Sequence, residues 1–282
     1  MNRFWSANAS PDTQAVMTLL LCFSLNMLGR GLSDSFAVFV LPLGREFGWS
    51  RAQMMGAYSI SLLVFASSAP FAGVLLDRYG HRRLYLTGLA CLSASLLGAS
   101  FADRLWEIYL CVGVLGGIAL ATLGMIPAAT LLRRWFTRSL STAMGIAYIG
   151  LGVGALLIVP AAQHIIDIAG WRWAYRSLGV FVAALALLAG LLPWRRITHG
   201  RSAAAPAADA LPEERVIPAL LRAMRRRMFW ALAGVFFFTS TGMFMVIIQI
   251  VAYLVAIGVP PLQAAGIFGS IGALSIVGMI GS

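Results

Sequence analysis

Long runs of apolar residues, separated by short polar segments, dominate the chain. An α-helix needs about 20 predominantly apolar residues to cross a bilayer, and each run is close to that length or longer. The pattern therefore predicts an all-α polytopic membrane protein. The predicted spans cover residues 16–41, 54–76, 84–101, 106–132, 140–166, 173–194, 228–257 and 262–282.

The spacing of these runs divides the chain into three parts. The first six spans make a complete N-terminal transmembrane half, residues 1–194, and the last two belong to a partial second half, residues 228–282. Between them, residues 195–227 combine an Ala- and Pro-rich stretch with an Arg-rich end, which is typical of a linker. Six helices, a linker and further helices is the layout of a transporter built from two halves.

A comparison of the chain with itself supports a repeated half. A shift of 210 residues aligns Gly48 with Gly258, Gln53 with Gln263 and Gly56 with Gly266. The same shift carries the polar turn that begins at residue 73 to the position directly after residue 282. We therefore interpret the chain as C-terminally truncated, with one complete half and two helices of the other.

Composition agrees with a membrane protein and sets its orientation. Hydrophobic residues make up 60% of the chain and charged residues 11%, and all 21 basic residues are Arg. If the N-terminus lies inside, fifteen arginines fall in cytoplasmic segments and five in outer loops. The positive-inside rule then predicts a multi-pass protein of the cell inner (plasma) membrane with a cytoplasmic N-terminus and linker. The same rule explains the net charge of +11 without a nucleic-acid partner.

The residues that could carry enzyme or metal chemistry are sparse. Cys22, Cys91 and Cys111 stand singly in apolar runs and are interpreted as packing residues. A membrane-embedded enzyme would need His and carboxylates, or a Ser with a base, converging inside the helices. Only three His occur, and none lies inside a span with a partner. We therefore predict no enzyme activity, no metal and no cofactor.

The polar segment 73–83 separates the second and third spans and reads Gly-Val-Leu-Leu-Asp-Arg-Tyr-Gly-His-Arg-Arg. Its charges cannot lie in hydrocarbon, so it is a helix-to-helix turn at the membrane surface. Gly80 supplies the reversal, and Gly73 lets one helix approach another closely. The plainer alternative is a turn whose arginines only anchor the protein. The residues assigned to this signature turn are Gly73, Asp77, Arg78, Gly80, Arg82 and Arg83.

This turn resembles the signature loop between helices 2 and 3 of the major facilitator superfamily of transporters. The resemblance implies a fold of two six-helix halves, and a latch in which the Asp and Arg side chains pair with each other and with neighbouring helix ends to close the cytoplasmic side. Residues 35–43, 46–51, 134–138 and 143–147 further resemble the bacterial monocarboxylate-porter-like branch of that superfamily. That branch implies a small monocarboxylate as substrate and protons as the coupling ion.

The first span carries three polar residues, Asn26, Arg30 and Asp34, at a spacing of four. They share one helix face and cover about 12 Å of its length. A charge near the bilayer centre costs about 2.5 to 3.5 kcal/mol on insertion scales, so Arg30 and Asp34 are expected to pair. One reading is a structural ion pair. The other is a charged stripe facing a water-filled cavity, where a proton on Asp34 frees Arg30 to bind an anionic substrate.

Two further residues are candidate substrate contacts. Tyr148 in the fifth span and Gln249 in the seventh can each form hydrogen bonds with a ligand, although such residues also bond neighbouring helices. Gly150, Gly152 and Gly154 are expected to let the fifth span pack tightly against another helix.

Three functions remain open from the sequence. The first is secondary active transport of a small organic solute by alternating access in the full-length protein, with a carboxylate moved by proton symport. The second is efflux of a drug or metabolite, and the third is a non-transporting fragment with a regulatory role. We expect the 282-residue chain not to transport by itself unless it dimerises or is completed.

Overall fold

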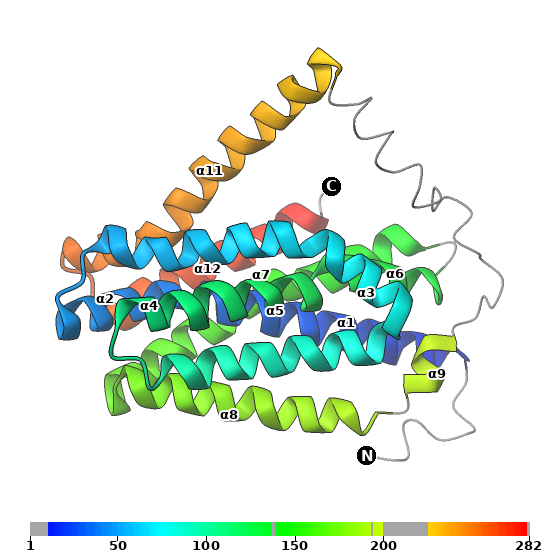
Figure 1. The fold of residues 1–282 in the computed structure, drawn as a ribbon, viewed down its shortest axis with the longest axis horizontal. Helices are drawn as coiled ribbons and strands as arrows, with labels where there is room; N and C mark the ends of the chain where they lie inside the picture. Colours follow the sequence, from blue (N-terminus) through cyan, green and yellow to red (C-terminus); the bar gives the residue numbers. More distant parts are fainter. Residues whose placement is uncertain (1–10, 137–138, 193, 200–224, 281–282) are drawn as a thin grey trace.

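A computed structural model describes residues 11–136, 139–192, 194–199 and 225–280, and this part of the chain is built from helices (Figure 1). The prediction of an all-α fold is confirmed for these residues. The helices are α1 (Pro11–Asp34), α2 (Phe36–Phe47), α3 (Arg51–Ala99), α4 (Leu105–Ile108), the π-helix η1 (Tyr109–Leu115), α5 (Gly116–Leu123), α6 (Met125–Arg133), α7 (Leu140–Ala169), α8 (Trp171–Gly190), α9 (Trp194–His199), α11 (Arg227–Ala256) and α12 (Pro261–Ile280).

Five stretches of the described chain are long and apolar enough to cross a membrane. They are Thr13–Phe47, Arg51–Ala99, Leu105–Arg133, Leu140–Ala169 and Trp171–Gly190. The second of them holds two predicted spans, because α3 doubles back on itself as a hairpin (Figure 1). The helices α11 and α12 overlap the two spans predicted after the linker, and residues 281–282 of the last span lie outside the described residues. Most of the predicted linker, residues 200–224, lies outside the described residues.

The first span is longer than predicted and is divided into α1 and α2. The break lies at Ser35, whose hydroxyl donates to the carbonyl of Leu32 at 2.7 Å. Such local bonds compete with the helical ladder and often bend helices. The span continues past residue 41 to Phe47, and Gly48 ends it in the left-handed conformation with φ 68°.

The signature turn is tighter than the sequence indicated. The first arm of α3 runs helically to Tyr79, Gly80 alone leaves helical geometry with φ 77° and ψ 168°, and the second arm starts at His81. Because this backbone conformation is essentially restricted to glycine, the predicted reversal at Gly80 is confirmed. Of the charged residues of the turn, Asp77 and Arg78 therefore end one helical arm, and Arg82 and Arg83 begin the other.

The fourth predicted span is a series of short elements. It starts as α4, widens into the π-helix η1, continues as α5 and breaks at Gly124, whose ψ is −158°. Close packing explains part of this irregular course. A Cβ at Gly117 would stand 2.6 Å from the carbonyl oxygen of Ser61 on α3, so the two backbones nearly touch there.

The tightest helix pair is α1 with α7. A Cβ on Gly154 would stand 2.3 Å from the carbonyl oxygen of Met27, and one on Gly150 would stand 2.5 Å from that of Phe23. The tight packing predicted for the fifth span is thus confirmed at Gly150 and Gly154, with α1 as the neighbour. Side chains on any of these glycines would force the helices apart.

The two helices after the linker contact the first six-helix half differently. The helix α12 packs along α7, whereas α11 meets the bundle at α2 and its N-terminal end points away from the other helices (Figure 1).

The connections between the helices lie at the two ends of the bundle. We call the end with residues 77–83 the turn end, and the end with residues 46–51, 100–105 and 169–172 the opposite end.

Candidate functional site

The charged stripe on α1 forms as its spacing predicts. Arg30 Nε donates to Asp34 Oδ2 at 2.9 Å, so the expected ion pair is present. Asn26 lies one turn earlier with 1% of its surface exposed, and its Nδ2 donates to the carbonyl of Cys22 at 3.0 Å. The pair is uneven in burial, because the Arg30 side chain is 27% exposed and that of Asp34 only 7%.

Two acceptor atoms of the stripe are buried without a hydrogen-bond partner in the described part of the chain. They are Oδ1 of Asp34 and Oδ1 of Asn26. A buried acceptor left unpaired costs about 1 to 3 kcal/mol, and native proteins rarely keep one without a reason. The stripe can therefore accept a hydrogen-bond donor at two places about two helical turns apart, and at Asp34 it can also accept a proton.

Tyr58 belongs to the same neighbourhood and was missed in the sequence. It lies on α3 with 5% of its surface exposed, and it is close enough to interact electrostatically with both Arg30 and Asp34. A tyrosine inside an apolar span carries little signal by itself. The only available cue was its place on a second helix that could face the charged stripe.

The other predicted substrate contacts are less closely connected to the stripe. Tyr148 is half-buried on α7 and forms no hydrogen bond within the described residues. Gln249 is exposed on α11. The substrate-binding roles of both residues remain predictions.

The signature turn makes one of its expected links to a neighbouring helix end. Arg82 donates to the carbonyl of Gly190, the last residue of α8, at 3.1 Å. His81 is buried, and its Nε2 lies 3.1 Å from the hydroxyl of Thr130 on α6. The guanidinium groups of Arg78 and Arg83 lie over the ring of Tyr79, at 5.6 and 5.8 Å from its centre.

Two expectations for this turn are not met in the structure. Asp77 is exposed and forms no ion pair among the described residues, so the expected pairing with an Arg of the turn is absent. A Cβ on Gly73 would find no described atom within 4 Å, so the close helix approach expected there is also absent. The physical reasons are that the side chain of Asp77 is exposed to solvent and that the space beside Gly73 is open. Their role in gating remains a prediction.

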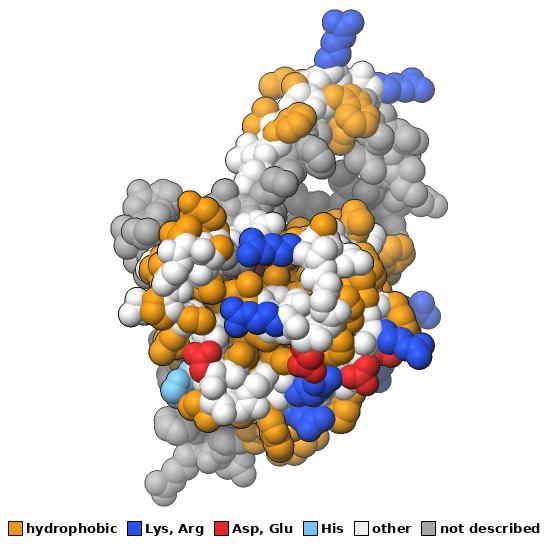
Figure 2. Space-filling model, turned by 90° about the vertical axis from the view of Figure 1, so that its left-hand side faces the viewer, with side chains coloured by type: hydrophobic (Ala, Val, Ile, Leu, Met, Phe, Trp, Pro, Cys, Tyr) orange, Lys and Arg blue, Asp and Glu red, His pale blue; other side chains and the backbone are white. Residues whose placement is uncertain are grey.

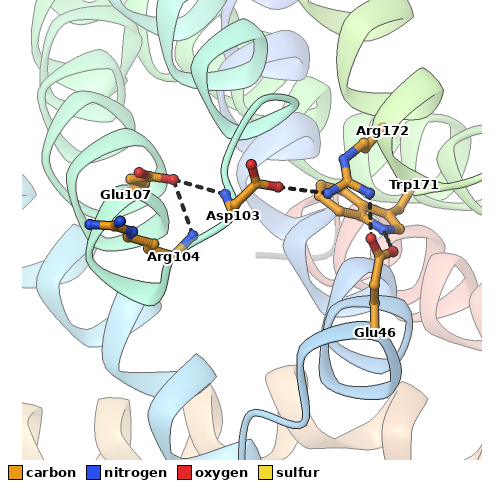
Figure 3. Close-up of polar contacts among 6 residues, drawn as sticks. All are labelled: Glu46, Asp103, Arg104, Glu107, Trp171 and Arg172. Atoms are coloured by element: carbon orange, nitrogen blue, oxygen red, sulfur yellow. Dashed lines mark hydrogen bonds and ion pairs between the residues drawn. The ribbon is translucent and has the colours of Figure 1, made fainter.

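The opposite end carries a polar cluster that the sequence did not reveal. Arg172 on α8 pairs with Glu46 at the end of α2 and, at 2.9 Å, with Asp103 in the α3–α4 connection (Figure 3). The indole of Trp171 donates to the second carboxylate oxygen of Glu46, and the guanidinium of Arg172 lies 4.4 Å from the centre of that indole ring. We call Glu46, Asp103, Trp171 and Arg172 the polar cluster of the opposite end. Figure 2 looks onto this end, where acidic and basic side chains lie side by side.

The described residues offer no metal site. No group of three or more His, Cys, Asp or Glu side chains converges in this part of the chain. The three cysteines are free thiols.

The helical fold and the signature turn agree with a comparison to known families. Residues 19–282 match the Major Facilitator Superfamily, and the chain belongs to that family. The predicted recognition and fold class are thereby confirmed. Members of this family are transporters rather than enzymes, and the chain is a multi-pass membrane protein.

Similar curated proteins point to one group of transporters. The chain is 27% identical to monocarboxylate transporter 4 of Rattus norvegicus over 255 residues, which cover 90% of this chain and 54% of the relative. It is 29% identical to monocarboxylate transporter 3 of the same species, over 91% of this chain and 52% of the relative. Monocarboxylate transporter 13 of Bos taurus is 28% identical over 94% of this chain and 60% of its own length. The chain thus spans about half the length of these relatives.

Proposed function

We propose that the chain is part of a secondary active transporter that moves a small monocarboxylate together with a proton by alternating access. The observation that carries the proposal is the ion pair between Arg30 and Asp34 inside a span, with one buried oxygen of Asp34 unpaired. The similarity to monocarboxylate transporters supports the substrate class. The stripe supplies a cation that can bind a carboxylate and an acid that can carry a proton.

The chemistry proposed for the stripe links the two solutes through one salt bridge. While Asp34 is ionised, it holds Arg30. When a proton binds to Asp34, the attraction between the two side chains is lost, and the guanidinium can pair with the carboxylate of a substrate. Release of the substrate restores the ion pair and returns the proton. Proton and anion then cross together, because a lone proton on Asp34 leaves the charge of Arg30 uncompensated, and a lone anion adds a second negative charge beside the ionised Asp34.

The shape of the described helices supports alternating access with the turn end on the cytoplasmic side. Helix α11 contacts α2 near the opposite end and diverges from the bundle toward the turn end (Figure 1). The excess of Arg in the segments of the turn end supports a cytoplasmic N-terminus and a plasma-membrane location. The protein with a completed second half, whether from a longer chain or from a second copy, is the expected transporting unit.

Uptake into proteoliposomes tests the proposal. An inward proton gradient is imposed, and entry of a labelled monocarboxylate and acidification of the lumen are recorded together. We expect Asp34→Asn to abolish proton entry coupled to the substrate, and Arg30→Gln to reduce substrate uptake at least about tenfold, since a charged hydrogen bond is worth about 1.5 to 3 kcal/mol. Arg51→Gln is the matched control, because Arg51 is an exposed arginine of the opposite end.

The uptake measurements test the role of Asp34 and the substrate class separately. If Asp34→Asn keeps proton-coupled uptake, the role of Asp34 is wrong. If wild-type protein with a completed second half moves no monocarboxylate under the gradient, the substrate class is wrong.

A further inference from the structure

The turn end contains a cavity that the proposed transport mechanism does not use. Its volume is about 730 Å³, within the range of sites that hold small molecules. Three segments meet around it: the hairpin bend of α3, the end of α6 with Arg134, and α9 together with Leu192. The described lining residues that matter here are Asp77, Arg82, Thr130, Arg134 and Trp194.

Two arginines from different segments face this cavity and are held in place by helix ends. Arg82 donates to the carbonyl of Gly190 at 3.1 Å, and Arg134 donates to the carbonyl of Thr198 at 2.8 Å. A guanidinium has five N–H donors, so the bond to the helix-end carbonyl leaves further donors of each group for another acceptor. The carbonyls at helix C-termini are favourable anchors for cations, which fixes the two groups without neutralising them.

The charge balance of the cavity favours an anion. Arg82 and Arg134 contribute two positive charges, and Asp77 contributes one negative charge. A planar guanidinium fork matches the oxygens of a phosphate group, and two forks from different helices can share one phosphate.

The surroundings connect the cavity to the apolar surface of the bundle. Leu76, Leu192 and Trp194 line it beside the charged groups. Leu187 near the end of α8 and Leu191 directly after it are 75% and 79% exposed. A molecule with a phosphate and an apolar part would find both kinds of contact here, and basic pockets between helices at a membrane surface are known binding places for anionic head groups.

We propose that this cavity, with Arg82 and Arg134 as its ligands, binds a phosphate group at the turn end. A phosphodiester head group of an anionic lipid and free inorganic phosphate share this chemistry, and the experiment distinguishes the two sources. The site is separate from the charged stripe on α1, so a binding assay tests it independently of transport.

The experiment measures thermal unfolding of the purified 282-residue chain in a neutral detergent. Short-chain phosphatidylglycerol, short-chain phosphatidylcholine or inorganic phosphate is added in increasing concentration. We expect phosphatidylglycerol to raise the unfolding temperature and phosphatidylcholine to leave it unchanged. A shift with inorganic phosphate alone would identify the free ion as a ligand; a shift only with phosphatidylglycerol would identify the lipid. Either supports the site.

A pair of double variants provides the control. Arg82→Gln with Arg134→Gln removes both cavity arginines, whereas Arg83→Gln with Arg133→Gln removes the adjacent exposed arginines, which do not line the cavity. Both pairs lose the same charge. We expect the first pair to require about tenfold more ligand than the second for the same stabilisation. Equal responses of the two pairs, or an equal effect of phosphatidylcholine, would overturn the proposal.

Two single changes keep the test decisive if the double variant does not fold. Arg134→Gln is compared with Arg133→Gln, and the first is expected to bind more weakly. Asp77→Asn removes the negative charge of the cavity, so this variant is expected to bind the phosphate group at a lower concentration than the wild type. A weaker or unchanged response of Asp77→Asn, together with equal responses of the two arginine variants, would contradict the site.

Discussion

The two ion-pair systems in the described part of the chain differ in burial, in partners and in the elements that they join. Arg30 and Asp34 lie one turn apart on a single helix, and the acid is buried with one oxygen unpaired. Arg172 pairs with two acids from two other segments at the opposite end. All three side chains there are more than a third exposed. There, both oxygens of Glu46 have partners, one from Trp171 and one from Arg172.

The comparison indicates different roles for the two systems. The exposed cluster around Arg172 connects segments of the fold, whereas the buried pair of Arg30 and Asp34 has an acceptor that can take part in chemistry. The polar cluster of the opposite end joins α2, α8 and the α3–α4 connection, because Arg172 pairs with an acid from each of the other two segments (Figure 3). The ion pair on α1 joins two residues of one helix, and Oδ1 of Asp34 remains a buried acceptor without a hydrogen-bond partner among the described residues. Burial makes its two charges depend strongly on each other, whereas solvent weakens the dependence in the exposed cluster.

The largest expected effect comes from breaking the buried pair. Arg30→Gln leaves the carboxylate of Asp34 buried without its ion-pair partner, and removal of one member of a buried pair typically costs about 3 to 5 kcal/mol. We expect a clear fall in the thermal unfolding temperature of the protein in detergent. Replacing both residues, Arg30→Leu with Asp34→Leu, should recover most of the stability, since no lone charge remains buried. A double variant as unstable as Arg30→Gln would show that the lone charge is not the cause.

A second effect concerns the helix contact that supports the buried pair. Gly154→Ala places a methyl group 2.3 Å from the carbonyl oxygen of Met27, so α1 and α7 must separate. Overpacking of this kind costs about 1 to 3 kcal/mol. The matched control is Gly145→Ala on the same helix, where an added Cβ meets no atom within 4 Å. Thermal unfolding should show a loss for Gly154→Ala and none for Gly145→Ala; equal losses would mean that helix flexibility, not contact, is responsible.

The smallest effect is expected at the exposed cluster. Arg172→Gln removes both ion pairs of the opposite end, but exposed pairs contribute only about 0 to 1 kcal/mol each. The difference in unfolding temperature between wild type and variant should shrink further as salt is added, because salt screens exposed charges. If Arg172→Gln lowered the unfolding temperature as much as Arg30→Gln, and independently of salt, the two ion-pair systems would not differ as described.

The sequence predicted correctly those structural features that depend on a single helix or turn. Apolar length predicted the spans, and a spacing of four predicted the pair between Arg30 and Asp34. Gly80 was recognised as the reversal, because only glycine readily adopts its backbone conformation.

Features that depend on contacts between helices could not be predicted. The break at Ser35 and the π-helix at Tyr109–Leu115 give no local signal as strong as a proline in mid-helix. Glu46, Asp103 and Arg172 were visible only as loop charges, since more than 50 residues separate each from the next along the chain. Tyr58 was missed for the same reason.

The glycine contact between α1 and α7 has a mechanical consequence. At Gly150 and Gly154 the two backbones touch directly, so no side chain between them can change rotamer to permit sliding. Another face of α7 meets α12, where a Cβ on Gly269 would stand 3.1 Å from the Cα of Leu156. Helices α1 and α7 therefore form one rigid body at this level. Any rotation of one half of the molecule against the other would therefore occur at the contacts of α12 with α7 and of α11 with α2, and not between α1 and α7.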